Sequence, residues 1–436
     1  MTASAARVIE VEDDRTALAV MARNLHGRAD EKLVLVGVTG TNGKTTTCRV
    51  TAKILEAAGI RTGVLGTVSY SLGDEEIAAE RTTPEAPDLH RYLARMVASG
   101  CGACVMEVSS HALELRRVHG MRFAVAVFTN LTPEHLDFHG NMARYFEAKA
   151  ALFDRLEAGS TAVINIDDEY GRKLVARIGR RAAGGEAGAP RLMTFGETRD
   201  AEIRIASMQS GVEGLKMTLE SAGRIVKLES PLVGRFNGYN ISAAAAAARA
   251  MGVEWEAIER GVAGATTVPG RMERVGDQDF AVIVDYAHKE EALRMLLETA
   301  RAFTSGRLIL VFGCGGDRDR TKRPLMGRHA ARLADIVWVT SDNPRSERPE
   351  SIIEEILAGM AGADRQGDRI RVEPDRSKAI EAAITAARPG DSVIIAGKGH
   401  ETCQIIGDRV TPFDDRVVAR SVLAGLQEDE DDDGSP

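Results

Sequence analysis

From residue 33 onward, the chain alternates short apolar runs with longer segments in which apolar residues recur every three or four positions. The short runs have the length and β-branched content of buried strands, and the longer segments have the period of amphipathic helices. This alternation predicts an α/β fold in which parallel sheets are covered by helices on both faces. The strands predicted in the first half span 33–38, 62–68, 104–108, 123–128 and 161–166.

The second half repeats the pattern after a turn-rich stretch at 268–273, and it predicts a Rossmann-like domain. Its predicted strands span 281–285, 308–312, 336–340 and 392–396. Between the halves, we expect a small accessory sheet over 193–233 and an alanine-rich helix over 240–251. The predicted domains are a central domain over 33–268, a C-terminal domain over 269–425 and a disordered acidic tail over 426–436.

A glycine-rich loop that ends in Gly43-Lys44-Thr45 follows the first predicted strand and precedes a helix. This arrangement aims backbone N–H groups and the positive end of a helix dipole at one point, where a triphosphate can bind. Lys44 would reach the outer phosphates, and Thr45 would offer its hydroxyl to Mg²⁺. The loop is a variant, because Val38 stands where the common form has glycine. The residues predicted to bind the nucleotide are Thr39, Gly40, Thr41, Asn42, Gly43, Lys44, Thr45 and Thr46.

Polar side chains also follow the later strands of the first half. Glu107 ends an otherwise apolar strand, and a carboxylate at that edge of the sheet suits Mg²⁺, although it could instead cap the next helix. His135 follows the neighbouring strand, where a structural role is the simpler interpretation. Composition alone predicts that Lys149 is a solvated helix residue.

Four motifs of the first half together resemble the central domain of the Mur ligases: TGTNGKTTT, EVSSHAL, FTNLTPEHLDFHG and YFEAKAALF. Members of this family use ATP to build the peptide of bacterial cell-wall precursors. By the resemblance, Thr45, Glu107 and His135 bind magnesium, and Lys149 is carried as a carbamate that completes the metal site. A lysine ammonium would be repelled by Mg²⁺, whereas a carbamate would be attracted. The resemblance makes Lys44, Lys149, Glu107 and His135 the catalytic residues.

The second half resembles the Mur ligases that add the third residue to UDP-N-acetylmuramoyl-L-alanyl-D-glutamate. The motifs are VPGRME, VDYAH, VFGCGGDRDRTKRPLMG, TSDNPRSE and AGKGHETCQ. Asp-Asn-Pro-Arg is the form linked to meso-diaminopimelate, and lysine-adding relatives usually lack its arginine. The resemblance implies that the muramoyl dipeptide acceptor is held by Thr82, Thr83, Ser109 and Arg117. It implies that the amino acid is held by Arg318, Asp342, Asn343, Pro344, Arg345, Gly397 and Glu401.

Only 36 residues precede Gly37, whereas the family carries a whole N-terminal domain there, so we expect residues 1–32 to be a remnant of that domain. Two alternatives follow. The first is a Mur-like ligase that acts on a peptide without UDP, or on another acceptor such as a folate. The second is a nucleotide-binding partner without catalytic activity. The catalytic residues argue against the second alternative, because such a protein needs no metal site.

Charge and composition limit the partners. The net charge is −8, and six of the acidic residues lie in the run 428–433, so the folded body is nearly neutral and no nucleic-acid surface is predicted. No apolar run approaches the ~20 residues that cross a bilayer. Cys101 and Cys104 are expected to be ordinary thiols, which together with the absence of a leader indicates the cytoplasm. We therefore expect a cytoplasmic enzyme with small-molecule substrates, no nucleic-acid or membrane partner, and a sequence compatible with a monomer.

Overall fold

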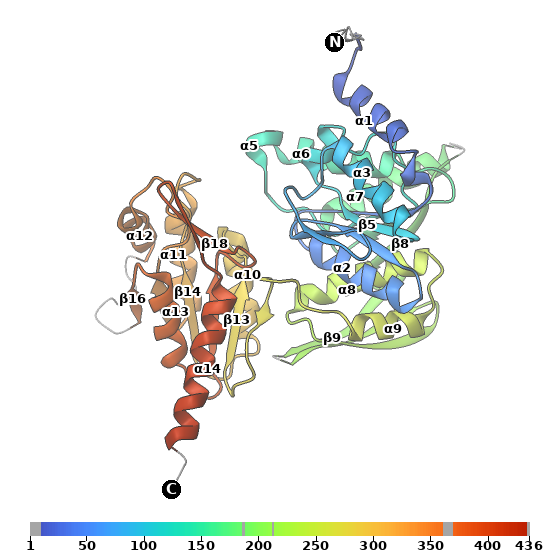
Figure 1. The fold of residues 1–436 in the computed structure, drawn as a ribbon. Coiled ribbons are helices and arrows are strands. Elements are labelled where there is room, and N and C mark those ends of the chain that lie inside the picture. The colour runs from blue at the N-terminus through green and yellow to red at the C-terminus, as the bar shows by residue number, and fades with distance from the viewer. Residues whose placement is uncertain (1–9, 185–187, 212, 361–368, 434–436) are drawn as a thin grey trace. The chain divides into compact units, whose positions relative to one another are not determined.

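The computed structural model describes residues 10–184, 188–211, 213–360 and 369–433. The chain divides into two compact units, whose elements are labelled in Figure 1. Unit 1 comprises Met1–Gln209, Leu215–Pro231 and Phe236–Ala265. Unit 2 comprises Ser210–Gly214, Leu232–Arg235 and Thr266–Pro436.

The larger sheet has a parallel centre, as the sequence predicted. Its strand order is β11-β10-β9-β8-β7-β6-β1-β5-β2-β3-β4, and β1 pairs in parallel with both β5 and β6. The carboxyl end of β1, where the glycine-rich loop begins, therefore lies in the middle of the sheet. The strands are β1 (Val34–Thr39), β2 (Thr62–Leu65), β3 (Ser69–Ser71), β4 (Glu76–Ala78), β5 (Ala103–Glu107), β6 (Val125–Phe128), β7 (Thr161–Asn165), β8 (Arg191–Gly196), β9 (Ile203–Gly211), β10 (Gly214–Ser221) and β11 (Arg224–Ser230).

Both faces of the central strands are buried. Leu35, Met106 and Phe128 belong to one core cluster with residues of α3, α6 and α7, while α2 packs on the strands as well and also contacts α9. A continuous apolar run suits such a strand, because neither face meets water. The helices up to residue 265 are α1 (Asp14–Leu25), the 3-10 helix η1 (Ala29–Glu31), α2 (Lys44–Ala57), α3 (Ala86–Ala98), α4 (Ser110–Glu114), α5 (Leu136–His139), α6 (Met142–Asp154), α7 (Glu169–Ala183), α8 (Arg235–Ala250) and α9 (Trp255–Ala263).

The expectation of a separate accessory sheet over 193–233 is wrong. β8 pairs in parallel with β7 over five residue pairs, and β9, β10 and β11 extend the same sheet outward from β8. Alternating strands and turns predict local hairpins, but the strand that accepts them at an existing edge is decided by packing. The strand predicted over 62–68 also ends early, at Leu65, where the chain turns into an antiparallel pairing with β3.

Unit 2 contains a second sheet in the order β12-β13-β17-β14-β15-β16, which is parallel except for β12. Three of its strands have the predicted bounds, and α13 and α14 share one core cluster with β13, β14 and β17. The strands are β12 (Glu273–Arg274), β13 (Ala281–Asp285), β14 (Leu308–Phe312), β15 (Ile336–Val339), β16 (Ile370–Val372) and β17 (Ser392–Ala396), with a separate hairpin of β18 (Cys403–Ile406) and β19 (Arg409–Pro412). The helices are α10 (Glu290–Arg301), α11 (Lys322–Leu333), α12 (Pro349–Ala358), α13 (Arg376–Thr385) and α14 (Asp415–Asp433).

The acidic run at the end of the chain differs from the expected disordered tail. α14 continues to Asp433, so 426–433 is helical, and residues 434–436 lie outside the described part. Adding a residue to an existing helix forms a backbone hydrogen bond without a new nucleation cost, which allows a helix to extend into a charged segment.

Arg376 and Asp415 form a fully buried ion pair in unit 2. The guanidinium donates from Nε and Nη2 to the two carboxylate oxygens, both at 2.7 Å, and neither side chain is exposed. Because a lone buried charge is costly, we expect Asp415→Asn to lower the free energy of unfolding by about 3–5 kcal/mol. Chemical denaturation measures this loss. The exposed Asp408→Asn is the control, and an equal effect of both substitutions would contradict the expectation.

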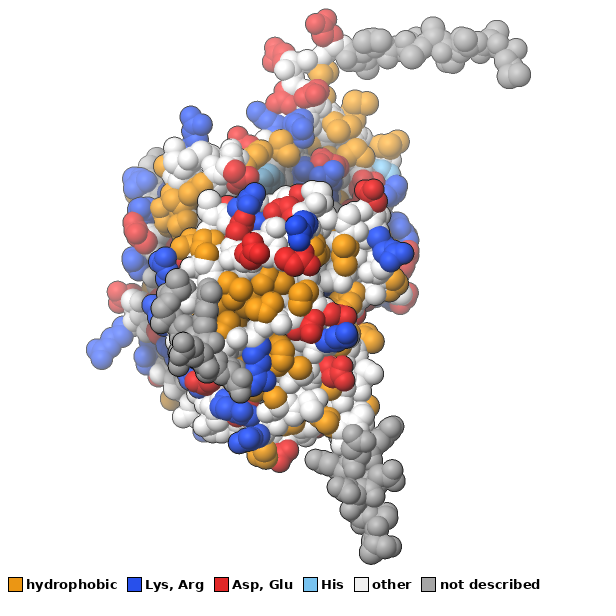
Figure 2. Space-filling view, turned by 90° about the vertical axis from the view of Figure 1, so that its left-hand side faces the viewer, with side chains coloured by type: hydrophobic (Ala, Val, Ile, Leu, Met, Phe, Trp, Pro, Cys, Tyr) orange, Lys and Arg blue, Asp and Glu red, His pale blue; other side chains and the backbone are white. Residues whose placement is uncertain are grey.

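Basic and acidic side chains are interspersed over the face drawn in Figure 2. Across the described ranges, helices that combine the length and apolarity of a membrane span do not occur. All five cysteines are free thiols, which confirms the expectation for Cys101 and Cys104.

Candidate functional site

The glycine-rich loop leaves β1 at the centre of the larger sheet and enters α2 at Lys44. Gly40 and Gly43 have positive φ angles of 146° and 84°, and a side chain at either position would collide with a polar side chain. Glycine is therefore required at both positions, by conformation and by space. Lys44 Nζ donates to the carbonyl oxygens of Gly40 at 3.0 Å and Thr41 at 2.7 Å, so the ammonium lies over the loop.

Glu107 connects this loop to the neighbouring strands. Its carboxylate is almost fully buried at the end of β5, and it accepts hydrogen bonds from the hydroxyls of Thr45 at 2.8 Å and Thr67 at 3.0 Å. The alternative that Glu107 caps the next helix is wrong, because Ser109 is the N-cap of α4. The hydroxyl of Thr45 and the carboxylate of Glu107, two of the predicted Mg²⁺ ligands, are thus hydrogen-bonded to each other.

Lys149 is buried, contrary to the expectation from composition. It lies on the inner face of α6 with 2% of its surface exposed, its Nζ donates to the Gly40 carbonyl at 2.8 Å, and its ammonium lies 4.7 Å from the centre of the Tyr145 ring. Burial lowers the pKa of Lys149 well below its usual value, and the nearby Lys44 cation lowers it further. The surroundings of the loop therefore disfavour the charged form of Lys149 relative to a lysine in water.

His135 lies at the N-terminus of the short helix α5 with a φ angle of 55°. Its side chain is 42% exposed, its ring is 4.9 Å from the ring of His111, and its Nε2 is 3.8 Å from a carboxylate oxygen of Glu134. Because this ring is accessible, His135 is not a packed structural histidine, which was the simpler interpretation of the sequence.

The residues expected to hold the acceptor lie together next to Glu107. Thr83 Oγ1 donates to the Glu107 backbone carbonyl at 2.8 Å and lies 3.3 Å from Ser109 Oγ. Thr82 Oγ1 lies 3.2 Å from the hydroxyl oxygen of Thr67, and Arg117 donates to the Thr83 carbonyl at 3.0 Å. Arg117 also forms an ion pair with Glu85 at 2.7 Å. A continuous network therefore links these residues to the carboxylate beside the loop.

In unit 2, the residues expected to hold the amino acid come from loops at the carboxyl ends of β14, β15 and β17. The side chains of Arg345 and Arg318 lie close to Gly315. A Cβ at this position would be 2.9 Å from a guanidinium nitrogen of Arg345 and 3.8 Å from Cγ of Arg318. Arg345 Nη1 donates to the Gly316 carbonyl at 2.9 Å, and Arg318 is exposed. The guanidinium of Arg345 therefore lies against Gly315, beside the aliphatic part of Arg318, and a guanidinium suits a carboxylate ligand.

Asn343 and Glu401 lie on the other side of this loop cluster. Asn343 Nδ2 donates to Glu401 Oε2 at 2.8 Å. The buried Nζ of Lys398 donates to Asn343 Oδ1 and to Glu401 Oε2. Gly397, at a φ angle of 121°, lies so close to Asp342 that a Cβ would be 2.6 Å from its carboxylate. Pro344 is buried, and its carbonyl lies against Gly316.

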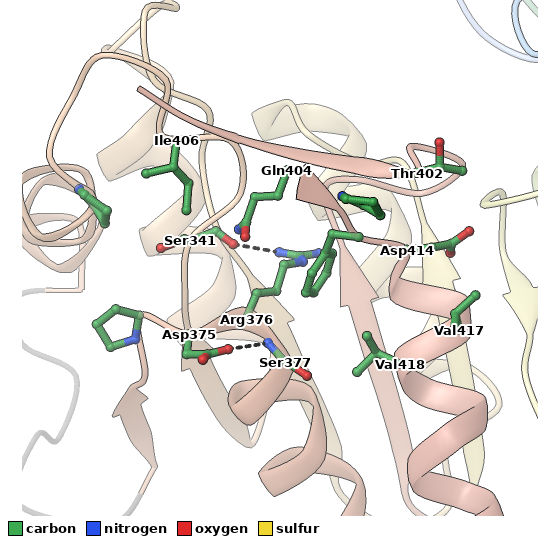
Figure 3. A pocket seen from close by; sticks show the side chains of 14 residues that line it. Ser341, Asp375, Arg376, Ser377, Thr402, Gln404, Ile406, Asp414, Val417 and Val418 are labelled. Atoms are coloured by element: carbon green, nitrogen blue, oxygen red, sulfur yellow. Dashed lines mark hydrogen bonds between the residues drawn. The ribbon is translucent and has the colours of Figure 1, made fainter. Parts of the chain in front are cut away.

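A pocket of about 840 Å³ lies beside the same loop (Figure 3). Arg376 is labelled below Ser341 in this view, and its guanidinium donates to the Ser341 carbonyl at 3.3 Å. Gln404, labelled above Arg376 in the same view, donates to the Asp342 carbonyl at 2.8 Å. Ser341 and Gln404, which line this pocket, therefore connect it to the start of the segment that carries Asp342 to Arg345.

Three contributors were missed from the sequence. Thr67 lies in a turn after β2 and binds Glu107, and no sequence signal marks it. Lys398 is buried among the residues expected to hold the incoming amino acid, although its motif indicated only a glycine-rich loop. Tyr145 contacts both Thr41 and Lys149, and its position four residues before Lys149 could have indicated a shared helix face.

The sequence matches the domains of a known family and several known proteins. Residues 38–248 match the Mur ligase middle domain, and residues 270–399 match the Mur ligase glutamate ligase domain. The chain is 48% identical over 424 residues to UDP-N-acetylmuramoyl-L-alanyl-D-glutamate--2,6-diaminopimelate ligase of Solibacter usitatus, covering 97% of this chain and 83% of that protein. It is 42% identical to the protein of the same name from Aquifex aeolicus, with 96% and 83% covered.

Solved structures show the same relationship. A structure of UDP-N-acetylmuramoyl-L-alanyl-D-glutamate--2,6-diaminopimelate ligase matches with a TM-score of 0.71 and 36% identity, over 94% of this chain and 83% of that one. A Mycobacterium tuberculosis folylpolyglutamate synthase matches with a TM-score of 0.69 at 18% identity, which indicates the fold alone.

A nucleotide-type loop in one α/β unit and a second, Rossmann-like unit define the class as an ATP-dependent ligase. The chain belongs to the Mur ligase family.

Proposed function

We propose that the protein adds meso-diaminopimelate to the D-glutamate of UDP-N-acetylmuramoyl-L-alanyl-D-glutamate, in the synthesis of peptidoglycan precursors. ATP phosphorylates the γ-carboxylate of the acceptor, the amine of the incoming amino acid attacks the acyl phosphate, and phosphate leaves. The observation that carries the proposal is the cluster of Lys44, Thr45, Glu107 and Lys149 around the Gly40 carbonyl and its loop. The likeness to proteins with this activity, at 40–48% identity, supports the choice of substrates.

The oxygen atoms near the loop fit Mg²⁺. Thr45 and Glu107 present hard oxygen donors that lie 2.8 Å apart, and Mg²⁺ is bound through such donors together with phosphate oxygens. Within the described ranges, no three His, Cys, Asp or Glu side chains are grouped as a metal site. A carbamate on Lys149 would supply further oxygens, and His135 is the fourth proposed ligand. When bound, Mg²⁺ would supply positive charge that stabilises the transferring phosphoryl group.

The burial of Lys149 favours the carbamate. A carbamate forms when a neutral amine adds to CO₂ and releases a proton, and the low pKa of Lys149 makes the neutral amine available. In the described part of the chain, Lys149 has no carboxylate at ion-pair distance, so its amine is not committed to a salt bridge.

The other residues bind and orient the reactants. Lys44 and the N–H groups at the start of α2 hold the phosphates, so that catalysis is positioning and electrostatic stabilisation. Thr82, Thr83, Ser109 and Arg117 hold the acceptor close to Glu107. Asp342, Asn343, Pro344, Gly397 and Glu401 form the amino-acid site with Arg318 and Arg345.

Phosphate release by the purified chain tests the proposal. We expect release only when ATP, Mg²⁺, the UDP-linked dipeptide and meso-diaminopimelate are all present, and mass spectrometry should identify the tripeptide product. Omitting each reactant in turn is the control. Equal release with a UDP-free dipeptide would favour the first alternative acceptor, and binding of ATP without any release would favour a non-catalytic partner.

Arg345 is expected to select diaminopimelate over lysine. Its guanidinium donates one hydrogen bond to Gly316 and retains donors for the distal carboxylate, which lysine lacks. We expect the wild-type kcat/KM to favour diaminopimelate by roughly 10³-fold or more, and Arg345→Ala to remove most of that preference. Steady-state kinetics with both amino acids measure it. The exposed Arg348→Ala is the control, and an unchanged preference in Arg345→Ala would contradict the assignment.

A further inference from the structure

We propose that Lys398 is a positioning residue that fixes the spacing between Glu401 and Arg345, and thereby the selection of the amino acid. This inference rests on the proposed function and deepens its amino-acid site. Lys398 lies two residues beyond β17, in the loop that also carries Glu401. Its side chain is 0% exposed, so the ammonium cannot contact a ligand in the site.

The Lys398 ammonium fixes the side chain of Asn343. Nζ donates to Asn343 Oδ1 at 3.0 Å and to Glu401 Oε2 at 3.2 Å, and Asn343 Nδ2 donates to the same Oε2 at 2.8 Å. A cation can only donate, so it requires the amide oxygen on its own side and directs the amide nitrogen to Glu401. Two donors therefore hold one oxygen of Glu401, and its side chain is 31% exposed, which leaves it accessible to a ligand ammonium.

The same amide leads to Arg345. Asn343 Oδ1 also accepts from the backbone N–H of Ile405 at 3.0 Å, and the Ile405 carbonyl accepts from the N–H of Arg345 at 3.0 Å. Gly407 then donates to the Arg345 carbonyl at 2.7 Å, which pairs this residue with the β18–β19 hairpin. Arg345 is held at a φ angle of 54°, a conformation that needs such support.

Lys398 is thus the shared support of two groups with opposite charge. Glu401 suits the ammonium of the incoming amino acid, and Arg345 suits a carboxylate at its other end. The distance between these groups decides which zwitterion reaches both. Without the lysine, the Asn343 amide can rotate and release both Glu401 and the hairpin, so selectivity is lost while the nucleotide loop of unit 1 is untouched.

Lys398→Met in the full chain tests this role, because it keeps the length of the side chain and removes the charge. We expect the KM for diaminopimelate to rise roughly ten- to a hundredfold, and the preference over lysine to fall by a similar factor. The KM values for ATP and for the acceptor should stay within about twofold, since a change of that size is below 0.5 kcal/mol. Lys378→Met, an exposed position on α13, is the matched control and should change none of these values.

A folded Lys398→Met protein with an unchanged KM for diaminopimelate would overturn the inference, and so would an equal rise of all three KM values. If Lys398→Met does not fold, Lys398→Gln replaces it, because the glutamine amide still donates to Asn343 but leaves Glu401 with one donor. An unchanged KM for diaminopimelate and an unchanged preference over lysine in that variant would again overturn the inference. Wild-type protein that does not use diaminopimelate would overturn the proposed function itself, whereas active wild-type protein with unaffected variants overturns only the role of Lys398.

Discussion

Replacing Lys149 by alanine is expected to lower kcat by about 10²–10³-fold and to leave a protein that formate or acetate partly reactivates. The side chain is 2% exposed and donates to the Gly40 carbonyl beside Lys44. Loss of the carbamate removes negative charge where Mg²⁺ is proposed to bind. Loss of one well-placed electrostatic group lowers kcat by roughly 10²–10³-fold in comparable sites. The shortened side chain leaves space in which a small carboxylate can replace the missing oxygens.

Steady-state kinetics at increasing formate concentration measure the rescue, and intact mass under bicarbonate tests for added CO₂ on the wild-type protein. Lys173→Ala is the matched control, because Lys173 also lies over a tyrosine ring, at 4.5 Å from the centre of Tyr170, but is exposed. Near wild-type activity of Lys149→Ala, or an active wild-type enzyme with unmodified Lys149, would refute the carbamate.

Replacing Lys44 by alanine should reduce turnover by at least about 10²-fold while the melting temperature changes little. The ammonium lies over the loop on the carbonyl oxygens of Gly40 and Thr41, where we propose that it contacts phosphates, and it is not part of the apolar core. Loss of these two hydrogen bonds from a part-buried group should cost about 1–2 kcal/mol in stability.

ADP release and thermal unfolding together check this prediction. Lys53→Ala, on the same helix α2 and in an exposed ion pair with Glu56, is the control for surface charge and helix propensity. A Lys44→Ala protein with an unchanged melting temperature and near wild-type ADP release would show that the loop does not bind the reacting nucleotide.

Much of the fold could be predicted from local pattern. The strands at 281–285, 308–312 and 392–396 have the predicted bounds, because a continuous apolar run flanked by turn residues fits a strand that is buried on both faces. The glycine-rich loop was also predictable, since its conformation requires glycine at Gly40 and Gly43 and its strand and helix flank it directly in the chain.

The local pattern could not determine which elements pack together. Residues 193–233 join the central sheet because β8 pairs with β7 and the following strands extend the sheet from β8. The availability of β7 for this pairing is a property of the whole unit. The strand at 62–68 ends at Leu65 because a tight approach to Glu107 follows, where a Cβ at Gly66 would be 2.7 Å from the carboxylate. These contacts join residues that are far apart in the sequence.

The sequence by itself therefore determined the α/β class, the loop around Lys44 and the family resemblance, all of which depend on neighbouring residues. Only the tertiary structure decided that Lys149 and Lys398 are buried, that Thr67 binds Glu107 and that Asn343 is held by a lysine. The physical reason is that the environment of a charged side chain depends on the elements packed around it: burial lowers the pKa of Lys149 and gives Lys398 fixed hydrogen-bond partners.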